Sequence, residues 1–139
     1  TEPESPKARG RALMQRGALT EAIAAFEQAL VASPDDVWVL DALGFSYFSV
    51  ARFADAERCC RRSIELGPSN HYAFKGLGLC LARLGDPEAG IAALRRSIEL
   101  DPDFADAHHD LGVVLTEHGR SDEAEACFER ARELRSPNR

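Results

Sequence analysis

The sequence lacks any long apolar run. No stretch of about 18 consecutive apolar residues occurs in its 139 residues, which excludes a membrane-spanning helix. It also lacks a basic excess, because 17 Lys and Arg stand against 23 Asp and Glu, for a formal net charge of −6. Nucleic-acid binding needs positive charge to neutralise phosphates, so it is not expected. A hydrophobic content of 45% nevertheless excludes simple disorder.

Cysteines are few, and their spacing is unsuited to a bridge or a metal. Cys59, Cys60, Cys80 and Cys127 form no C-x-x-C pair, and adjacent cysteines on a helix make a strained disulfide. We therefore expect small buried thiols, no zinc site and a reducing compartment, which indicates the cytoplasm.

The chain also lacks an initiator methionine and an apolar signal region, since it begins at Thr1. We expect a processed or excised fragment, and disorder over residues 1–5, which are polar and contain a proline.

Catalytic signatures are missing as well. Gly76-Leu77-Gly78 has neither the third glycine nor the preceding strand of a dinucleotide-binding loop. His108 and His109 are adjacent, so on a helix they point to different faces and do not share a metal. Asp106 and Asp110 flank His109 with no nucleophile or oxyanion donor beside them. The sequence predicts no enzyme and no cofactor.

A fixed interval of 34 residues is the main feature present. It relates the Leu-Gly pairs at Leu43, Leu77 and Leu111, and it also relates Pro34, Pro68 and Pro102. A period of this length indicates stacked supersecondary units. We expect one array over residues 1–139, with repeats at about 3–36, 37–70, 71–104 and 105–137.

Each repeat reads as a helical hairpin. Phe74, Leu77 and Leu81 share one helical face, Gly85 ends that helix, and Asp86-Pro87 begins the next. Ser5 with Pro6, and Thr20, are the predicted caps of the first two helices. The glycines at 44, 78 and 112 are expected to let helix backbones approach closely. The predicted helices are 6–16, 20–33, 37–50, 54–66, 71–84, 87–100, 105–118 and 121–135.

These residues resemble the tetratricopeptide repeat family. The matches are Leu40, Leu43, Gly44, Tyr47, Ala56 and Pro68, then Phe74, Leu77, Gly78, Leu81 and Pro102, then Leu111, Gly112, Leu115, Ala124, Phe128 and Ala131. The departures are Cys60 and Leu94 at an aromatic position, Ser63 and Ser97 at an alanine position, and His108 at a bulky core position. The resemblance implies an all-α, right-handed α-solenoid of antiparallel helix pairs with about four repeats.

The resemblance also implies a non-enzymatic scaffold that binds a peptide or helix of another protein in a concave groove. The first helix of each repeat lines that groove in the family. The implied groove residues are Lys7, Arg11, Trp38, Asp41, Phe45, Phe48, Tyr72, Lys75, Leu79, Arg83, Asp106, His109, Asp110 and Val113.

The segment 37–50 is the most informative part of this groove, because it is apolar on the groove stripe as well as on the core stripe. Trp38, Phe45, Phe48, Tyr72 and Leu79 are expected to form one continuous apolar floor. For Phe48, packing against a neighbouring repeat is an alternative to a role in the groove. The groove charges are predicted to be basic in the first three repeats and acidic in the fourth, although singly each is more often a solvated helix charge.

Other interpretations stay open at this stage. The chain could self-associate through apolar surface left uncovered near Val114 and Cys127, since no extra helix follows residue 135. It could be the regulatory arm of a larger enzyme, or serve a secretion system as class II secretion chaperones do. Two specialised ligand sites of the family are missing here. The chaperone-binding carboxylate clamp would need Asn at Ala42 and Arg or Asn at Gly76. The asparagine ladder of the glycosyltransferase members is also missing, because its places hold Ala8, Ala42, Gly76 and Asp110.

Overall fold

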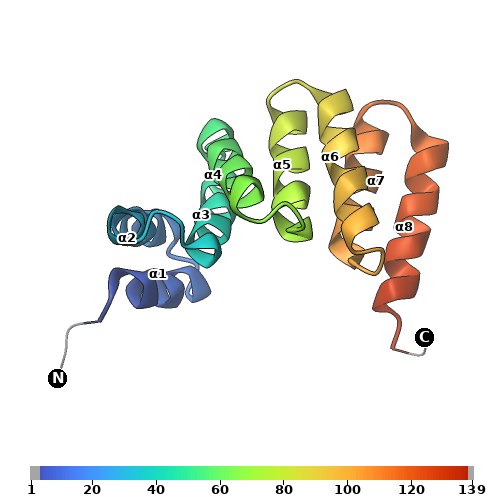
Figure 1. The fold of residues 1–139 in the computed structure, drawn as a ribbon. Helices are drawn as coiled ribbons and strands as arrows, with labels where there is room; N and C mark the ends of the chain where they lie inside the picture. The colour runs from blue at the N-terminus through green and yellow to red at the C-terminus, as the bar shows by residue number, and fades with distance from the viewer. Residues whose placement is uncertain (1–3, 138–139) are drawn as a thin grey trace. The chain divides into compact units, whose positions relative to one another are not determined.

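The computed structural model describes residues 4–137, which form eight α-helices in consecutive antiparallel pairs (Figure 1). The predicted boundaries agree with the structure to within one residue at each end, and the all-helical hairpin architecture is confirmed. Of the segment 1–5 expected to be disordered, residues 1–3 lie outside the described part. The helices are α1 (Pro6–Gln15), α2 (Leu19–Ala32), α3 (Val37–Ser49), α4 (Phe53–Leu66), α5 (His71–Arg83), α6 (Pro87–Leu100), α7 (Ala105–Glu117) and α8 (Ser121–Arg135).

Side-chain caps start four of these helices. The side chains of Ser5, Asp36, Asn70 and Asp86 each accept a hydrogen bond from the backbone N–H three residues later, at the open end of the following helix. The predicted caps Ser5 and Asp86 are thus confirmed. The predicted cap at Thr20 is wrong: α2 begins one residue earlier, because the carbonyl of Ala18 already accepts from the N–H of Ala22.

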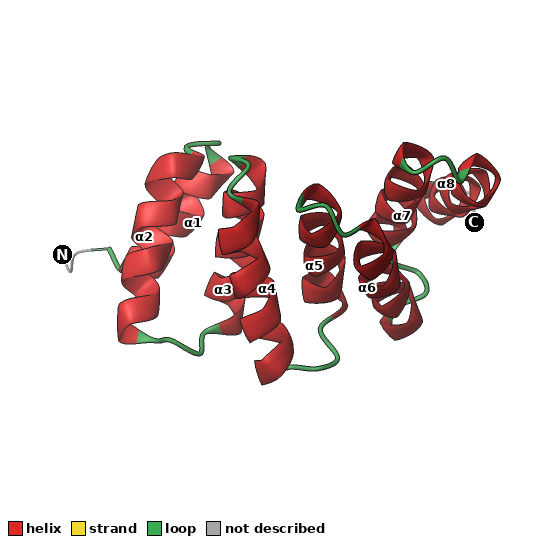
Figure 2. Cartoon of the chain, turned by 90° about the horizontal axis from the view of Figure 1, so that it is seen from above, coloured by secondary structure: helices red, strands yellow, loops and turns green. Residues whose placement is uncertain are grey.

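The chain divides into two compact units, which we call unit 1 (Thr1–Pro68) and unit 2 (Ser69–Arg139). Unit 1 holds α1–α4 and unit 2 holds α5–α8, and only helices and short loops occur among the described residues (Figure 2).

In unit 1 the core lies where α2 and α3 pack together. Phe26 and Val39 are fully buried there, and the Tyr47 hydroxyl donates to Glu27 Oε2 over 2.7 Å. Burial and this hydrogen bond to Glu27 both raise the pKa of Tyr47. The contact between α2 and α3 is thus stabilised by apolar burial and by the hydrogen bond from the Tyr47 hydroxyl to Glu27.

In unit 2 a single cluster joins α6, α7 and α8. Its buried members are Ile91, Leu94, Leu111, Val114, Leu115 and Ala124. The expectation of exposed apolar surface near Val114 is wrong, because Val114 is 0% exposed inside this cluster. Cys127 is half-buried against the same cluster.

On α8, Glu125 and Arg132 occupy the repeat positions that hold the cluster residues Ile91 and Ile98 on α6. Both charged side chains are exposed. The apolar surface expected at this end is therefore limited to partly exposed residues such as Cys127 and Leu134, and self-association stays a prediction.

The glycines at the helix crossings differ from one another. A Cβ on Gly78 would lie 2.7 Å from the carbonyl oxygen of Gly90 and 2.7 Å from Leu94 Cγ, so this position requires glycine, as predicted. At Gly44 the nearest atoms, on Cys59 and Cys60, would be 3.6 Å away, an ordinary contact. The expectation of an obligatory close approach is therefore wrong at Gly44, where the small Cys60 leaves room.

The two serines that depart from the family pattern have a structural use. Ser63 and Ser97 are fully buried. Ser63 Oγ donates to Asp41 Oδ1 over 2.6 Å, and Ser97 Oγ donates to the carbonyl of His71 over 2.7 Å. Each hydroxyl therefore links the second helix of its repeat to the first, which an alanine cannot do.

Candidate functional site

The outer face of α3 in unit 1 exposes two aromatic rings. Trp38 is 38% exposed and Phe45 is 48% exposed. Trp38 is held from below by Phe26 of α2, whose ring centroid lies 5.9 Å away in an edge-on arrangement. The α2–α3 packing thus positions a large ring that is still open to solvent.

Two cations of α1 lie over this tryptophan. The Arg11 guanidinium carbon is 4.7 Å from the Trp38 ring centroid, and Lys7 Nζ is 5.6 Å from it. Lys7 also forms an ion pair of 2.9 Å with Asp36. Among residues 4–137, no carboxylate forms an ion pair with Arg11, so its charge is balanced only by the ring and solvent. We call the set Lys7, Arg11, Trp38 and Phe45 the Trp38 surface.

Asp36 organises this surface. Its carboxylate accepts from Lys7 Nζ and from the N–H of Val39, so one side chain caps α3 and orients α1. The hydrogen bond from Lys7 is the main cause that holds the pKa of Asp36 below its ordinary value, and partial burial opposes the shift. Sequence reasoning missed Asp36 as a member of the site, although its place just before the helix was a signal for capping.

The other two predicted residues of α3 have packing roles. Asp41 is half-buried and accepts from Ser63 of α4. Phe48 is half-buried, and its ring meets Phe53 of α4 edge-on with centroids 5.2 Å apart. The packing alternative for Phe48 therefore has direct support, and both residues join α3 to α4.

Unit 2 presents a different arrangement around Lys75. The Nζ atom lies 5.1 Å from the Tyr72 ring centroid and 5.8 Å from that of Phe104, and it is 3.7 Å from Asp110 Oδ2. The Lys75 and Asp110 side chains are largely buried. Lys75 is thus enclosed by two rings and a carboxylate of its own unit.

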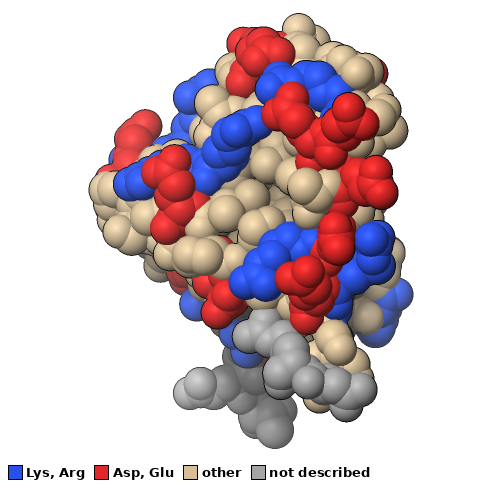
Figure 3. All heavy atoms as spheres, turned by 90° about the vertical axis from the view of Figure 1, so that its right-hand side faces the viewer, with Lys and Arg blue, Asp and Glu red and all other residues tan. Residues whose placement is uncertain are grey.

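The predicted charges Arg83 and Asp106 also have ion-pair partners within unit 2. Arg83 Nη1 lies 3.1 Å from Glu117 Oε1, and Asp106 pairs with Arg135 of α8. Figure 3, which faces the α8 side of the molecule, shows basic and acidic side chains intermingled there. Within unit 2, the predicted basic residues Lys75 and Arg83 of α5 therefore pair with the acidic residues Asp110 and Glu117 of α7.

Of three further predicted groove residues of unit 2, Leu79 and Val113 are half-buried and His109 is exposed. Leu79 is half-buried against the α6–α8 cluster, and Val113 is half-buried on α7. The His109 ring meets that of Phe128 edge-on at 5.4 Å, whereas His108 Nε2 lies 2.8 Å from the Pro102 carbonyl. The two histidines thus face different partners, as predicted.

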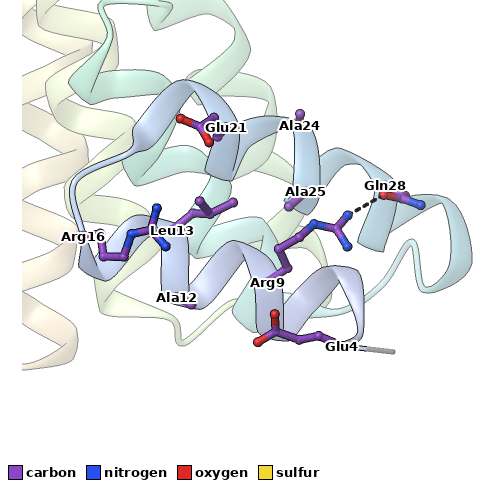
Figure 4. Close-up of a pocket in the computed structure, with 9 residues that line it drawn as sticks. All are labelled: Glu4, Arg9, Ala12, Leu13, Arg16, Glu21, Ala24, Ala25 and Gln28. Carbon is purple, nitrogen blue, oxygen red and sulfur yellow. Dashed lines mark hydrogen bonds between the residues drawn. The ribbon is translucent and has the colours of Figure 1, made fainter. Parts of the chain in front are cut away.

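A pocket of 470 Å³ between α1 and α2 was not anticipated (Figure 4). Its floor is apolar, and its rim carries Arg9, Arg16 and Glu21. The Arg9 guanidinium crosses from α1 to donate to Gln28 Oε1 of α2 over 2.7 Å. Arg9 replaces an apolar family residue, which was the one signal in the sequence.

Comparison with known proteins gives the family. Profiles described as "Tetratricopeptide repeat" match residues 42–103 and 82–139, and one described as "TPR repeat" matches residues 10–50. The chain belongs to the tetratricopeptide repeat family. The resemblance seen in the sequence, and the division into about four repeats, are thereby confirmed.

Similar proteins are of two kinds. The human "Tetratricopeptide repeat protein 7A" is 31% identical over 83 residues, which are 60% of this chain but only 10% of that protein. The chain therefore spans about a tenth of this relative. A crystal structure of MamA has a TM-score of 0.80 at 25% identity, covering 93% of this chain and 75% of that one. "MamA 41-end from Desulfovibrio magneticus RS-1" has a TM-score of 0.85 at 23% identity, covering 96% and 75%, and shows the fold alone.

Tetratricopeptide repeat proteins are scaffolds for protein–protein interaction and are typically non-catalytic. Within residues 4–137, no group of three or more His, Cys, Asp or Glu side chains is placed to hold a metal ion. No helix in that range combines the length and apolarity needed to cross a lipid bilayer.

Proposed function

We propose that the Trp38 surface of unit 1 binds an acidic, partly apolar segment of a partner protein. The observation that carries this proposal is an exposed tryptophan stacked beneath Arg11, a guanidinium with no carboxylate partner among the described residues. An apolar side chain of the partner covers Trp38 and Phe45, and a carboxylate beside it pairs with Arg11.

The exposed rings supply the affinity. Burying roughly 100 Å² of apolar surface on one ring contributes on the order of 2–3 kcal/mol before ordering costs. Trp38 and Phe45 together therefore support a dissociation constant in the micromolar range once a charge-assisted hydrogen bond to Arg11 is added. Aromatic residues and arginine are the side chains that most often dominate such interfaces.

The charges supply the selectivity. Arg11 contacts a ring and no carboxylate among residues 4–137, so it is open to a carboxylate of the partner, whereas Lys7 already forms an ion pair with Asp36. In unit 2 the basic candidates Lys75 and Arg83 already have carboxylate partners. A role for the unit 2 residues in lengthening the binding surface stays a prediction.

Calorimetry with two short peptides of equal length tests the proposal. One alternates Glu with Leu and Phe, and the other alternates Lys with the same apolar residues. The acidic peptide is expected to bind at least tenfold more tightly, and Arg11→Glu is expected to abolish or reverse this preference.

Arg83→Glu is the control, because Arg83 is also an exposed arginine on the first helix of a repeat, in unit 2. It should leave the preference for the acidic peptide unchanged. Equal binding of the two peptides, or an equal effect of the two arginine substitutions, would refute the proposal.

A further inference from the structure

The pocket between α1 and α2 lies on a different face from the Trp38 surface. Ala12 and Leu13 of α1 and Ala24 and Ala25 of α2 line it, and Figure 4 shows Arg9 reaching across it. These apolar side chains are only partly covered by unit 1, apart from Ala25, which is buried. The pocket is thus open to solvent, lined mainly by alanines and surrounded by charged side chains.

The 34-residue period shows which residues of the fourth repeat are equivalent to those that line the pocket. Three repeats further along the chain, the positions of Arg9, Ala12 and Leu13 are occupied by Leu111, Val114 and Leu115 of α7. Those three residues are buried, and they share one cluster with Ile91 and Leu94 of α6. In unit 2, therefore, an amphipathic α-helix occupies the position that corresponds to the pocket.

Charges around the pocket follow the same equivalence. Glu21 corresponds to Glu123, which pairs with Arg95 of α6 at 3.2 Å. Arg9 corresponds to Leu111, which is packed in the α6 cluster that holds Ile91. A helix that docks in the pocket as α6 docks on α7 and α8 should thus have a basic residue at the position of Arg95, opposite Glu21. At the position of Ile91 it should have an acidic residue, opposite Arg9.

We propose that this pocket docks an amphipathic helix of a partner protein, with an acidic residue opposite Arg9 and a basic residue opposite Glu21. A second copy of this chain fits less well, because its α4 has this pattern as Glu57 and Arg61 but pairs those two side chains with each other at 2.7 Å. Its α8 offers Glu125 at the first of these positions, but Glu129 at the second, where it would face Glu21. Like charges placed opposite each other disfavour that pairing.

Two peptides copied from α6 test the proposal. Both have the sequence of residues 86–101 and are held helical by a staple on the exposed side, and one carries Ile91→Glu. A staple is needed because a helix of this length is marginal in water. Amide chemical-shift changes in the intact protein are expected to cluster on residues 9–28, with the Ile91→Glu peptide binding about threefold to tenfold more tightly.

The Arg9→Leu variant of the protein should reverse that order, because it restores the residue found at position 111. Ala24→Trp should abolish binding by filling the pocket, whereas Ala92→Trp, at the same position of the third repeat and also exposed, should not. Trp38→Ala should leave binding intact, which separates this proposal from the proposed function.

The proposal fails if neither peptide shifts residues 9–28 at millimolar concentration, or if Arg9→Leu leaves the order of the peptides unchanged. Sedimentation decides about the occupant. A self-association that Ala24→Trp abolishes would overturn the partner helix in favour of a second copy.

Discussion

The two units are built on the same repeat but use its first helices differently. Trp38 in unit 1 and Tyr72 in unit 2 are one interval of 34 residues apart, and both rings lie under a cation. Over Trp38 the cations are Lys7 and Arg11 from another helix, and Arg11 has no carboxylate partner among the described residues. Over Tyr72 the cation is Lys75 of the same helix, which Asp110 also contacts.

This difference shows that the repeat fixes the positions of the side chains, whereas local neighbours decide whether a charged side chain has an ion-pair partner. In unit 2 the cations at the candidate positions are neutralised by carboxylates of α7. In unit 1, α1 carries Lys7, Arg9 and Arg11 and no acidic residue, so α1 retains positive charge. We therefore expect a partner bearing carboxylates to be drawn to α1.

The largest expected effect concerns the helix crossings of the two units. Gly78→Ala should lower the free energy of unfolding by about 1–3 kcal/mol, because the new Cβ overlaps the Gly90 carbonyl and Leu94. Gly44→Ala is the matched change in unit 1, and it should raise stability by about 0.5–1 kcal/mol through helix propensity. Chemical denaturation of both variants measures the difference, and destabilisation of equal size at the two sites would contradict it.

The next effect is on binding of the acidic peptide. Trp38→Ala should weaken it about tenfold or more, because the ring that the peptide covers is lost. Tyr72→Ala, at the equivalent position of unit 2, should change affinity less than threefold. Calorimetry distinguishes the two, and an equal loss at Tyr72 would mean that binding is not confined to unit 1.

A third difference lies in the turns inside the hairpins. Gly17, Gly85 and Gly119 adopt positive φ, and the equivalent residue of the second repeat is Ala51, with φ of 64°. A side chain in this left-handed conformation costs about 1 kcal/mol, so Ala51→Gly should stabilise the protein by up to that amount. Thermal unfolding tests this, with Gly85→Ala as the opposite change, expected to destabilise. A lower melting temperature for Ala51→Gly would count against strain at this turn.

The smallest effect concerns Asp36. Asn can still cap α3, so Asp36→Asn removes chiefly the pair with Lys7 and should cost less than about 1 kcal/mol at neutral pH. Because the pKa of Asp36 is lowered in the folded state, its contribution is present above the unfolded pKa of about 3.9 and is lost as the pH falls through the folded value. Denaturation at several pH values should show the wild type and the variant converging in acid. A gap that persists below the folded pKa would exclude the charge pair as its cause.

Much of the fold could be predicted from the sequence, because helix boundaries follow from local signals such as Asp86-Pro87 and Gly85 that recur at a fixed interval. Errors arose where a tertiary neighbour decided the outcome. Gly44 has room for a Cβ because Cys60 is small and the Ala56 carbonyl oxygen would be 3.9 Å away, and Val114 is covered by α6 and α8 rather than left open.

The candidate site was predictable only in part. The surplus of apolar residues on 37–50 pointed to Trp38 and Phe45, and both are exposed. Which charges pair could not be read from the sequence, since Lys75 with Asp110 and Arg83 with Glu117 meet across different helices. The same holds for Arg11, whose place over Trp38 depends on how α1 packs on α2 and α3.

The emission of Trp38 tests the central claim most directly, because it is the single tryptophan of the chain and therefore reports on this surface alone. Titration with the acidic peptide should shift the emission maximum to shorter wavelength and saturate at the affinity found by calorimetry, and Arg11→Glu should suppress the shift. An unchanged emission while calorimetry records binding would place the peptide elsewhere and contradict the account.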